Sequence, residues 1–332
     1  MIKTKLAEIT KTEDHNIIIT DSGTDAFILA LFCTGVSTGD EVILPIGICA
    51  SMIRAVMRVG AIPILIDVDY TLSINQKSIS QYISQKTKAV LCTHPNGIIK
   101  DYGWLKVLQA SMSDSFYIIE DCAQAFGGIF KEQPIGNQGD CSIYSFGKTK
   151  PVPALRGGAL RVNGKICINH ITYSHTLGEI EIEKLQESLS LVDKIIEQKQ
   201  KIAKIYCEKL SFLGEIIEPR IDIYSNIFHR VIISLNDQYR IYMKLIIEEA
   251  KKNAECDLIL CQEGLDVYKE IFGFLNDYYN KIKRPDLVCH SLSDFHCWAY
   301  LYSKYLYFRT NLCVDYYHVE KFCTQLAHHF VE

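Results

Sequence analysis

Two patterns of apolar and polar positions alternate along the first half of the chain. Short runs rich in β-branched residues, bounded by polar residues, Gly or Pro, predict buried strands. These runs are residues 17–20, 41–44, 62–67, 88–92, 116–120 and 141–144. Amphipathic stretches between them predict helices at residues 24–34, 51–59, 76–84 and 102–112. Because strands and helices alternate, we expect an α/β fold with a mostly parallel central sheet flanked by helices.

The pattern changes after Gly157 and Gly158. Residues 178–213 form a long, charged, amphipathic stretch that predicts helix. Residues 218–235 are more strand-like, and residues 239–252 and 319–331 predict helices. We therefore expect a large domain at residues 1–210 and a smaller α+β C-terminal domain at residues 211–332.

Charge and hydropathy narrow the class of protein. The 332 residues include 35 Lys and Arg against 39 Asp and Glu, so the formal charge is 35 − 39 = −4. Because no basic block occurs, we expect neither a nucleic-acid partner nor a membrane-surface partner. The longest apolar stretch, near residues 42–57, is interrupted by Pro45, Gly47 and Arg54 and falls short of the ~18 uninterrupted apolar residues of a membrane span. The N-terminus has no apolar core of a signal peptide, so we expect a cytoplasmic protein.

The thirteen cysteines do not indicate a disulfide framework. Their number is odd, they are scattered, and no CxxC pair occurs, so free cysteines in a reducing compartment are the simplest interpretation. Cys289-His290 and His296-Cys297 mirror each other, but their spacing fits no standard zinc site. We expect no metal.

Candidate chemistry lies where predicted strands end, because ligands of such sheets bind at the carboxyl ends of the strands. Ser22, Gly23 and Thr24 follow a strand and open a helix, where free N–H groups can bind an anion; a simple N-cap by Ser22 is equally consistent. Asp121 ends another strand. Its carboxylate can hold a proton on a heterocyclic nitrogen, or it can be a structural N-cap.

A lysine loop follows the next strand, in the sequence YSFGKTKP at residues 144–151. A lysine on a tight loop can be a Schiff-base nucleophile. Taken alone, an exposed loop lysine is more often a solvated surface residue. Gly157 and Gly158 then permit close backbone approach before a strand.

Taken in order, the motifs SGT, GDEVILP, GAIPILIDVD, IIEDCAQAFGG, GDCSIYSFGKTK and GGAL resemble those of the DegT/DnrJ/EryC1/StrS aminotransferases. These are fold-type-I enzymes that use pyridoxal 5′-phosphate (PLP) and are best known for aminating nucleotide-linked keto sugars. The resemblance is dense over residues 17–162 and faint beyond residue 184. It implies the PLP cofactor, a PLP-binding role for the large domain, and a homodimer.

The resemblance also implies roles for single residues. Lys150, five residues after Ser145, matches the lysine that forms the internal aldimine, and Lys148 falls on a variable position. Asp121 matches the residue that pairs with the pyridinium nitrogen and so makes the ring an electron sink.

Four further residues match cofactor contacts of the family. Gln124 corresponds to a residue near the ring oxygen of the cofactor. Ser145 and the backbone of Gly23 and Thr24 correspond to the phosphate site.

The chain departs from the family in three places. Cys49 stands where an aromatic residue often stacks on the ring, and we interpret it as the mark of a subgroup that packs a sulfur there. The region 172–179 is shortened and lacks the N-Y-R stretch that reaches the neighbouring subunit's cofactor, which puts a shared phosphate site in doubt. The late substrate-binding loop is not recognisable in residues 256–296.

Three residues are candidates for contact with substrate. Arg156 follows the lysine loop, and Arg309 occupies a place where an arginine can bind the carboxylate of an amino donor. His94 follows a strand and matches a family histidine, although a structural, hydrogen-bonded role is the main alternative.

The function that follows is a ping-pong aminotransferase. It moves an amino group from an amino acid, with glutamate as the expected donor, to a keto sugar nucleotide or related small ketone through the Lys150 aldimine. One alternative is a PLP enzyme of another reaction type, such as elimination or condensation. Lys150 argues against the family's dehydratase branch, which has histidine at that position. Another alternative is a catalytically degenerate partner protein.

Overall fold

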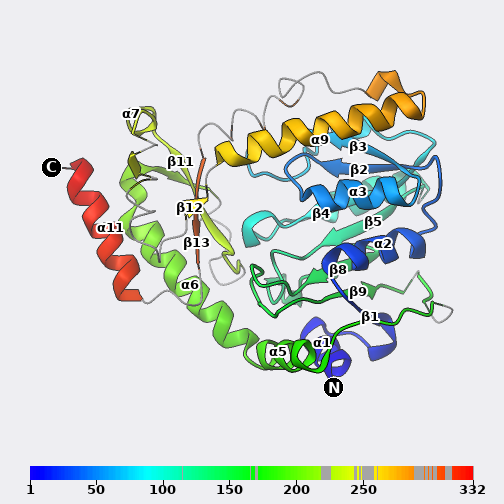
Figure 1. Ribbon diagram of the computed structural model, residues 1–332, viewed down its shortest axis with the longest axis horizontal. Helices are drawn as coiled ribbons and strands as arrows, with labels where there is room; N and C mark the ends of the chain where they lie inside the picture. Colours follow the sequence, from blue (N-terminus) through cyan, green and yellow to red (C-terminus); the bar gives the residue numbers. More distant parts are fainter. Residues whose placement is uncertain are drawn as a thin grey trace. The chain divides into compact units, whose positions relative to one another are not determined.

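The computed structural model describes two compact units, each considered by itself (Figure 1). One comprises Met1–Glu197 with Ile221–His229, and the other Gln198–Arg220 with Arg230–Glu332. The described residues are 1–113, 115–164, 166–168, 171–217, 226–242, 245–246, 248, 258–259, 261–287, 295, 298, 301, 305–310 and 316–331. Helix α6 contributes residues to both units, and the domain boundary expected near residue 210 stays a prediction.

The first unit is built on a seven-stranded sheet in the order β1-β9-β8-β5-β4-β2-β3. Neighbouring strands pair in parallel except at β9, which is antiparallel to both β8 and β1. The strands are β1 (Ile17–Thr20), β2 (Glu41–Pro45), β3 (Ile62–Ile66), β4 (Thr87–Thr93), β5 (Tyr117–Asp121), β8 (Cys141–Ser145) and β9 (Gly158–Val162). A small hairpin joins β6 (Ile129–Phe130) to β7 (Gln133–Pro134). The predicted α/β class and all six predicted strands are confirmed.

Helices flank this sheet (Figure 1). Helix α2 packs on β8 and β9 and against α3, and α4 packs on β5. Every residue of β2, β3, β8 and β9 is buried, as in sheets covered on both faces. The helices are α1 (Ile2–Thr10), α2 (Gly23–Cys33), α3 (Ala50–Arg58), α4 (Gly103–Ser111) and α5 (Glu179–Ser190), with single turns η1 (Asp14–Asn16), η2 (Ile79–Gln81) and η3 (Pro95–Gly97).

The helix predicted at residues 76–84 is wrong, because only the single turn η2 forms there. The side-chain oxygen of Asn75 accepts the N–H of Lys77, and its carbonyl accepts those of Ser78 and Ile79. Asn competes with helices by such local bonds. The helical stretch predicted at residues 178–213 forms two helices, because α5 ends at Ser190 and α6 (Val192–Lys209) begins after Leu191.

The second unit contains a four-stranded sheet, β10-β11-β13-β12, whose neighbouring strands are antiparallel. Its elements are β10 (Gly214–Ile216), β11 (Arg230–Leu235), β12 (Leu258–Ile259), β13 (Tyr305–Arg309), α7 (Asp237–Arg240), α9 (Cys261–Lys281), α11 (Tyr316–Val331), η4 (Ser211–Leu213) and η5 (Pro285–Leu287). Tyr206 of α6 packs on Phe308 of β13, with ring centroids 5.1 Å apart. Helices beside an antiparallel sheet are the α+β arrangement expected for this region. Among the described residues, no helix combines the length and apolar character needed to cross a bilayer.

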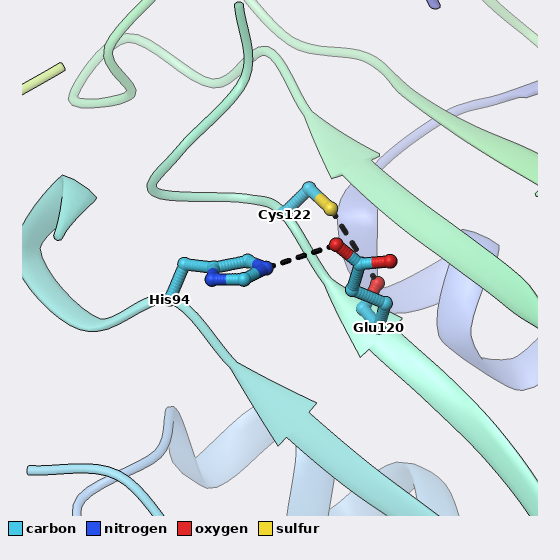
Figure 2. A group of neighbouring side chains, drawn as sticks. All are labelled: His94, Glu120 and Cys122. Carbon is cyan, nitrogen blue, oxygen red and sulfur yellow. Dashed lines mark hydrogen bonds and ion pairs between the residues drawn. The ribbon is translucent and has the colours of Figure 1, made fainter. Parts of the chain in front are cut away.

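A buried carboxylate, Glu120 of β5, fastens three segments of the first unit together. Its Oε1 accepts a bond from His94 Nε2 at 2.9 Å (Figure 2). The same oxygen accepts the N–H of Gly136, also at 2.9 Å. Its Oε2 accepts bonds from the N–H groups of Gln138 and Gly139, at 2.7 and 3.0 Å. A fully buried charge is tolerated only when it is bonded in this way. Glu120 therefore joins the end of β4, the end of β5 and the loop before β8.

The close approach of β9 to the start of α2 generates a first prediction. A Cβ atom added at Gly158 would lie 2.4 Å from the backbone C and O of Ser22, so Gly158→Ala forces the two backbones apart. We expect a loss of about 1–3 kcal/mol in the free energy of unfolding, measured by urea denaturation. Gly164→Ala is the control, because an added Cβ there meets nothing within 4 Å. Equal effects of the two substitutions would contradict this packing.

Glu120 generates a second prediction. Glu120→Gln replaces one acceptor oxygen by an NH₂ group, so buried N–H donors lose their acceptor, at a cost of about 1–3 kcal/mol each. Burial raises the pKa of Glu120, but the bonds from His94, Gly136 and Gln138 outweigh it and hold the pKa below its usual range. A lowered folded pKa gives stability that is present above the unfolded value of about 4.3 and lost as pH falls through the folded value.

We therefore expect the wild type to lose stability on acidification below about pH 4.3, and the Glu120→Gln variant to lose less. Urea denaturation at neutral pH and at a series of acidic pH values measures both effects. The exposed Glu13 provides the control variant Glu13→Gln. Unchanged stability of Glu120→Gln at neutral pH would refute the structural role.

Candidate functional site

The predicted polar residues gather at one edge of the sheet. Strands β1, β4, β5 and β8 run in the same direction, so their carboxyl ends share that edge. The strand register places Thr93 opposite Asp121. Ser145 and Thr20 are both paired with Gly158. The structure thus brings the segments around Gly23, Asp121 and Ser145 into one region, although the chain separates them widely.

A cluster of hydrogen-bond donors lies where α2 begins. Ser22 is the N-cap, and its Oγ accepts the N–H of Asp25 at 3.2 Å. A Cβ added at Gly23 would lie 2.7 Å from Cβ and 3.1 Å from Oγ of Ser145, so the helix start and that hydroxyl are in contact. Among the described residues, no acceptor takes the N–H of Gly23, the N–H of Thr24 or the O–H of Ser145. Three free donors at a helix N-terminus suit a phosphate group.

The side chain of Thr24 is connected to Cys49 by hydrogen bonds through Ser51, a residue that the sequence pattern did not indicate. Thr24 Oγ1 donates to Ser51 Oγ, and Ser51 Oγ donates to Cys49 Sγ, both at 3.1 Å. Cys49 is the N-cap of α3 and is exposed. Its position near the free donors at the start of α2 is compatible with packing against a bound ring. Ser51 lies two residues after Cys49, in the first turn of α3. That short spacing is the sequence signal that could have pointed to Ser51.

Asp121 has one oxygen fixed and one oxygen free. Its Oδ1 accepts the N–H of Ala123 at 2.9 Å, and no described donor reaches Oδ2. Burial raises the pKa of this carboxyl above its usual range, although the Lys150 ammonium, the Ala123 N–H and His94 act in the opposite direction. The ionised form therefore gains from a further cation, and the protonated ring nitrogen of PLP is a group of that kind.

Gln124 is oriented by a backbone contact. Its Oε1 accepts the N–H of Asn96 at 2.7 Å. The amide nitrogen, Nε2, has no acceptor among the described residues, so it can donate to a ligand. This is the polarity needed to meet the ring oxygen of PLP.

The lysine loop presents its two lysines differently. The backbone N–H of Lys150 donates to the carbonyl of Gly147 at 2.9 Å and closes a tight turn. Lys148 is exposed, whereas Lys150 is half-buried and close enough to Asp121 to lower the pKa of that carboxyl. The geometry favours Lys150 as the lysine that faces the site.

His94 is fixed by the protein on both sides. The N–H of Lys100 donates to Nδ1 at 3.0 Å, so the ring proton resides on Nε2 and is donated to Glu120. Its side chain is fully buried. Both ring nitrogens are therefore bonded within the protein and neither is free for a substrate, which favours the structural role for His94.

The three buried side chains in Figure 2 are close enough to suggest a metal site. The ligand atoms of His94, Glu120 and Cys122 lie within 4.8 Å of one another. However, the histidine nitrogens and both Glu120 oxygens are already hydrogen-bonded, and burial raises the pKa of the Cys122 thiol. We interpret the group as a hydrogen-bonded core. The Cys289-His290 and His296-Cys297 pairs lie outside the described residues.

The two candidate arginines have different surroundings. Arg156 is half-exposed and binds Asp21, Thr176 and Glu181. Arg309 ends β13 opposite Arg230 in the second unit, and its side chain lies outside the described part of the chain. Contact of either residue with substrate stays a prediction.

Known proteins similar to this chain include sugar-modifying enzymes. A GDP-perosamine synthase of Escherichia coli O157:H7 is 30% identical over 223 residues, which cover 61% of this chain and 61% of that protein. A UDP-N-acetyl-3-dehydro-alpha-D-glucosamine 3-aminotransferase of Acidithiobacillus ferrooxidans is 29% identical over 236 residues, or 65% of this chain and 63% of that protein. The matches therefore span less than two thirds of the length of these relatives.

Solved structures extend the likeness over the whole chain. The protein Spr1654 of Streptococcus pneumoniae, named as a sugar aminotransferase, has a TM-score of 0.81 in its PMP (pyridoxamine phosphate) form at 19% identity, covering 98% of this chain and 88% of that one. Its PLP form gives a TM-score of 0.79. At this identity the likeness establishes the fold, and the expected PLP aminotransferase-like fold is confirmed.

The model of the DegT/DnrJ/EryC1/StrS aminotransferase family matches residues 2–262, which include every motif from Ser22 to Gly158. The predicted resemblance is thereby confirmed, and this chain belongs to the DegT/DnrJ/EryC1/StrS aminotransferase family.

Proposed function

We propose that this protein is a PLP-dependent aminotransferase. It moves an amino group from an amino acid, with glutamate as donor, to a keto sugar nucleotide or a related small ketone. One observation carries the proposal: free hydrogen-bond donors, a carboxylate with a free oxygen and a half-buried amine meet at one sheet edge. These groups belong to Gly23, Thr24, Ser145, Asp121 and Lys150.

The described residues fit the parts of the cofactor one by one. The free N–H groups of Gly23 and Thr24 and the Ser145 hydroxyl suit its phosphate. The free oxygen of Asp121 suits its ring nitrogen, and the Gln124 amide suits its ring oxygen. When bound, the cofactor supplies a carbonyl carbon that condenses with amines and a ring that accepts electrons.

The protein's own residues then perform two tasks. The Asp121 carboxylate keeps a proton on the ring nitrogen, because a buried anion favours an adjacent cation. With the cofactor bound, the Lys150 amine would take the proton from the substrate's α-carbon and deliver it to the cofactor. Lys150 lies on a tight turn, and its ammonium is close enough to Asp121 to lower the pKa of that carboxyl.

The names of the relatives support the choice of acceptor. Two of them, a GDP-perosamine synthase and a UDP-sugar aminotransferase, carry a nucleotide sugar in their names. Another relative is named L-glutamine:scyllo-inosose aminotransferase, so glutamine is the donor to compare with glutamate. We further propose that the protein acts as a homodimer, which sedimentation analysis can test.

Exchange of the lysines generates a third prediction. Lys150→Ala removes the only amine that we place in the site, so borohydride reduction should no longer attach PLP to the protein. Lys148→Ala should leave attachment unchanged, because Lys148 is exposed two residues away. Peptide mass spectrometry after reduction measures both. Attachment at Lys148, or none in the wild type, would refute the assignment.

The reaction type generates a fourth prediction. Holoenzyme mixed with glutamate or glutamine alone should release the keto acid and shift the cofactor to its amine form, recorded by absorbance. The amine form should then be discharged by a keto sugar nucleotide or by a related small ketone such as scyllo-inosose, recorded as the return of the original absorbance. Consumption of the donor without the amine form would instead favour elimination or condensation. Absence of any reaction with PLP bound would favour the degenerate partner protein.

A further inference from the structure

Asp21 anchors the turn that precedes the phosphate-binding donors, yet it has no part in the proposed chemistry. It comes directly before Ser22, the N-cap of α2. Its Oδ1 accepts the N–H and the hydroxyl of Thr176, at 2.7 and 3.0 Å, and its Oδ2 accepts the hydroxyl of Tyr173 at 3.1 Å. Residues 173 and 176 lie in the shortened region that departs from the family pattern.

Arg156 joins the same contacts from the far end of the lysine loop. Its NH2 group donates to the carbonyl and the hydroxyl of Thr176, at 2.8 and 2.9 Å, and lies 3.4 Å from Asp21 Oδ1. Its Nε lies 2.7 Å from a carboxylate oxygen of Glu181. The next residue, Gly157, forms a backbone bridge with Ser22. Three segments therefore meet behind the start of α2.

Two carboxylates, those of Asp21 and Glu181, share the guanidinium of Arg156 at this junction. Burial raises the pKa of Asp21, but the bonds from Thr176 and Tyr173 and the Arg156 charge outweigh it and hold the pKa below its usual range. Asp21 is therefore ionised at neutral pH. An unbalanced carboxylate beside an anion site would repel a phosphate, and the Arg156 guanidinium opposes that repulsion.

We infer that Asp21 is a positioning residue for the phosphate of PLP. Held by Thr176, Tyr173 and Arg156, it fixes the backbone of Ser22–Thr24 so that the donors of Gly23 and Thr24 face the phosphate. On this view Arg156 is part of the same anchor rather than a substrate contact. The inference rests on the proposed function, because it assumes PLP at this site.

The test compares two ligands that differ only in the phosphate. Apoprotein is titrated with PLP and with pyridoxal, and dissociation constants are taken from absorbance and fluorescence. Asp21→Ala should weaken PLP binding about tenfold, because several bonds to a charged group are lost. Pyridoxal binding should stay within about twofold of the wild type, since it has no phosphate to position.

Three further variants sharpen the comparison. Asp21→Asn should keep most of the PLP affinity, because its amide oxygen still accepts both bonds from Thr176. Thr176→Ala changes an exposed residue and should weaken PLP binding by a smaller factor, so it serves if Asp21→Ala does not fold. Asp101→Ala is the matched control, because Asp101 also binds a backbone N–H and a cation, Lys131, away from the site.

Each other outcome has a definite meaning. Unchanged or tighter PLP binding by Asp21→Ala would show that the carboxylate repels the phosphate or does nothing, and would overturn the inference alone. An equal loss for PLP and pyridoxal would show a general structural role, and it too would overturn only the inference. A wild type that does not prefer PLP over pyridoxal would overturn the phosphate site itself, and with it both the proposed function and this inference.

Discussion

The four hydrogen bonds to the buried carboxylate of Glu120 are the interaction on which the rest of the site depends. Two oxygens accept the N–H of His94 and three backbone N–H groups from residues 136–139. These bonds hold the end of β4, the end of β5 and the loop that leads into β8. A buried charge that lost one of its donors would be costly, so the arrangement is specified closely. The same bonds therefore fix the segments next to Asp121 and Ser145, the strand ends that carry candidate chemistry.

Glu120 and Asp121 are adjacent carboxylates with opposite environments. The first is saturated with donors, and its pKa lies below the usual range. The second has one oxygen free, and burial raises its pKa. Because successive strand residues point to opposite faces of the sheet, one carboxylate can serve the core while its neighbour faces a ligand. The contrast favours a structural role for Glu120 and a ligand-binding role for Asp121.

The free donors at the start of α2, which we propose bind the phosphate, depend on close backbone contacts at two glycines. Gly23 lies against Ser145, and Gly158 lies against the backbone of Ser22. The start of α2 is thereby held between β8 and β9, while Asp21 and Arg156 fasten it to residues 173–181. The proposed anion site would thus depend on local geometry more than on net charge, and a formal charge of −4 for the chain does not exclude it.

The sequence by itself determined the six strands, the parallel sheet and the order of the motifs, because β-branched runs and turn residues act locally. It also indicated Gly23, Asp121 and Ser145, since strand ends of a parallel sheet meet at one edge, whereas the choice of Lys150 over Lys148 came from the resemblance to the family. Only the tertiary structure decided that His94 is occupied by Glu120 and Lys100, that Arg156 is bound to Asp21 and Thr176, and that Ser51 connects Thr24 with Cys49. Most of these partners lie far apart in the chain, and a hydrogen bond between distant residues leaves no local pattern to read. The failed helix at residues 76–84 shows the converse, because a few bonds to Asn75 were enough to override an amphipathic pattern.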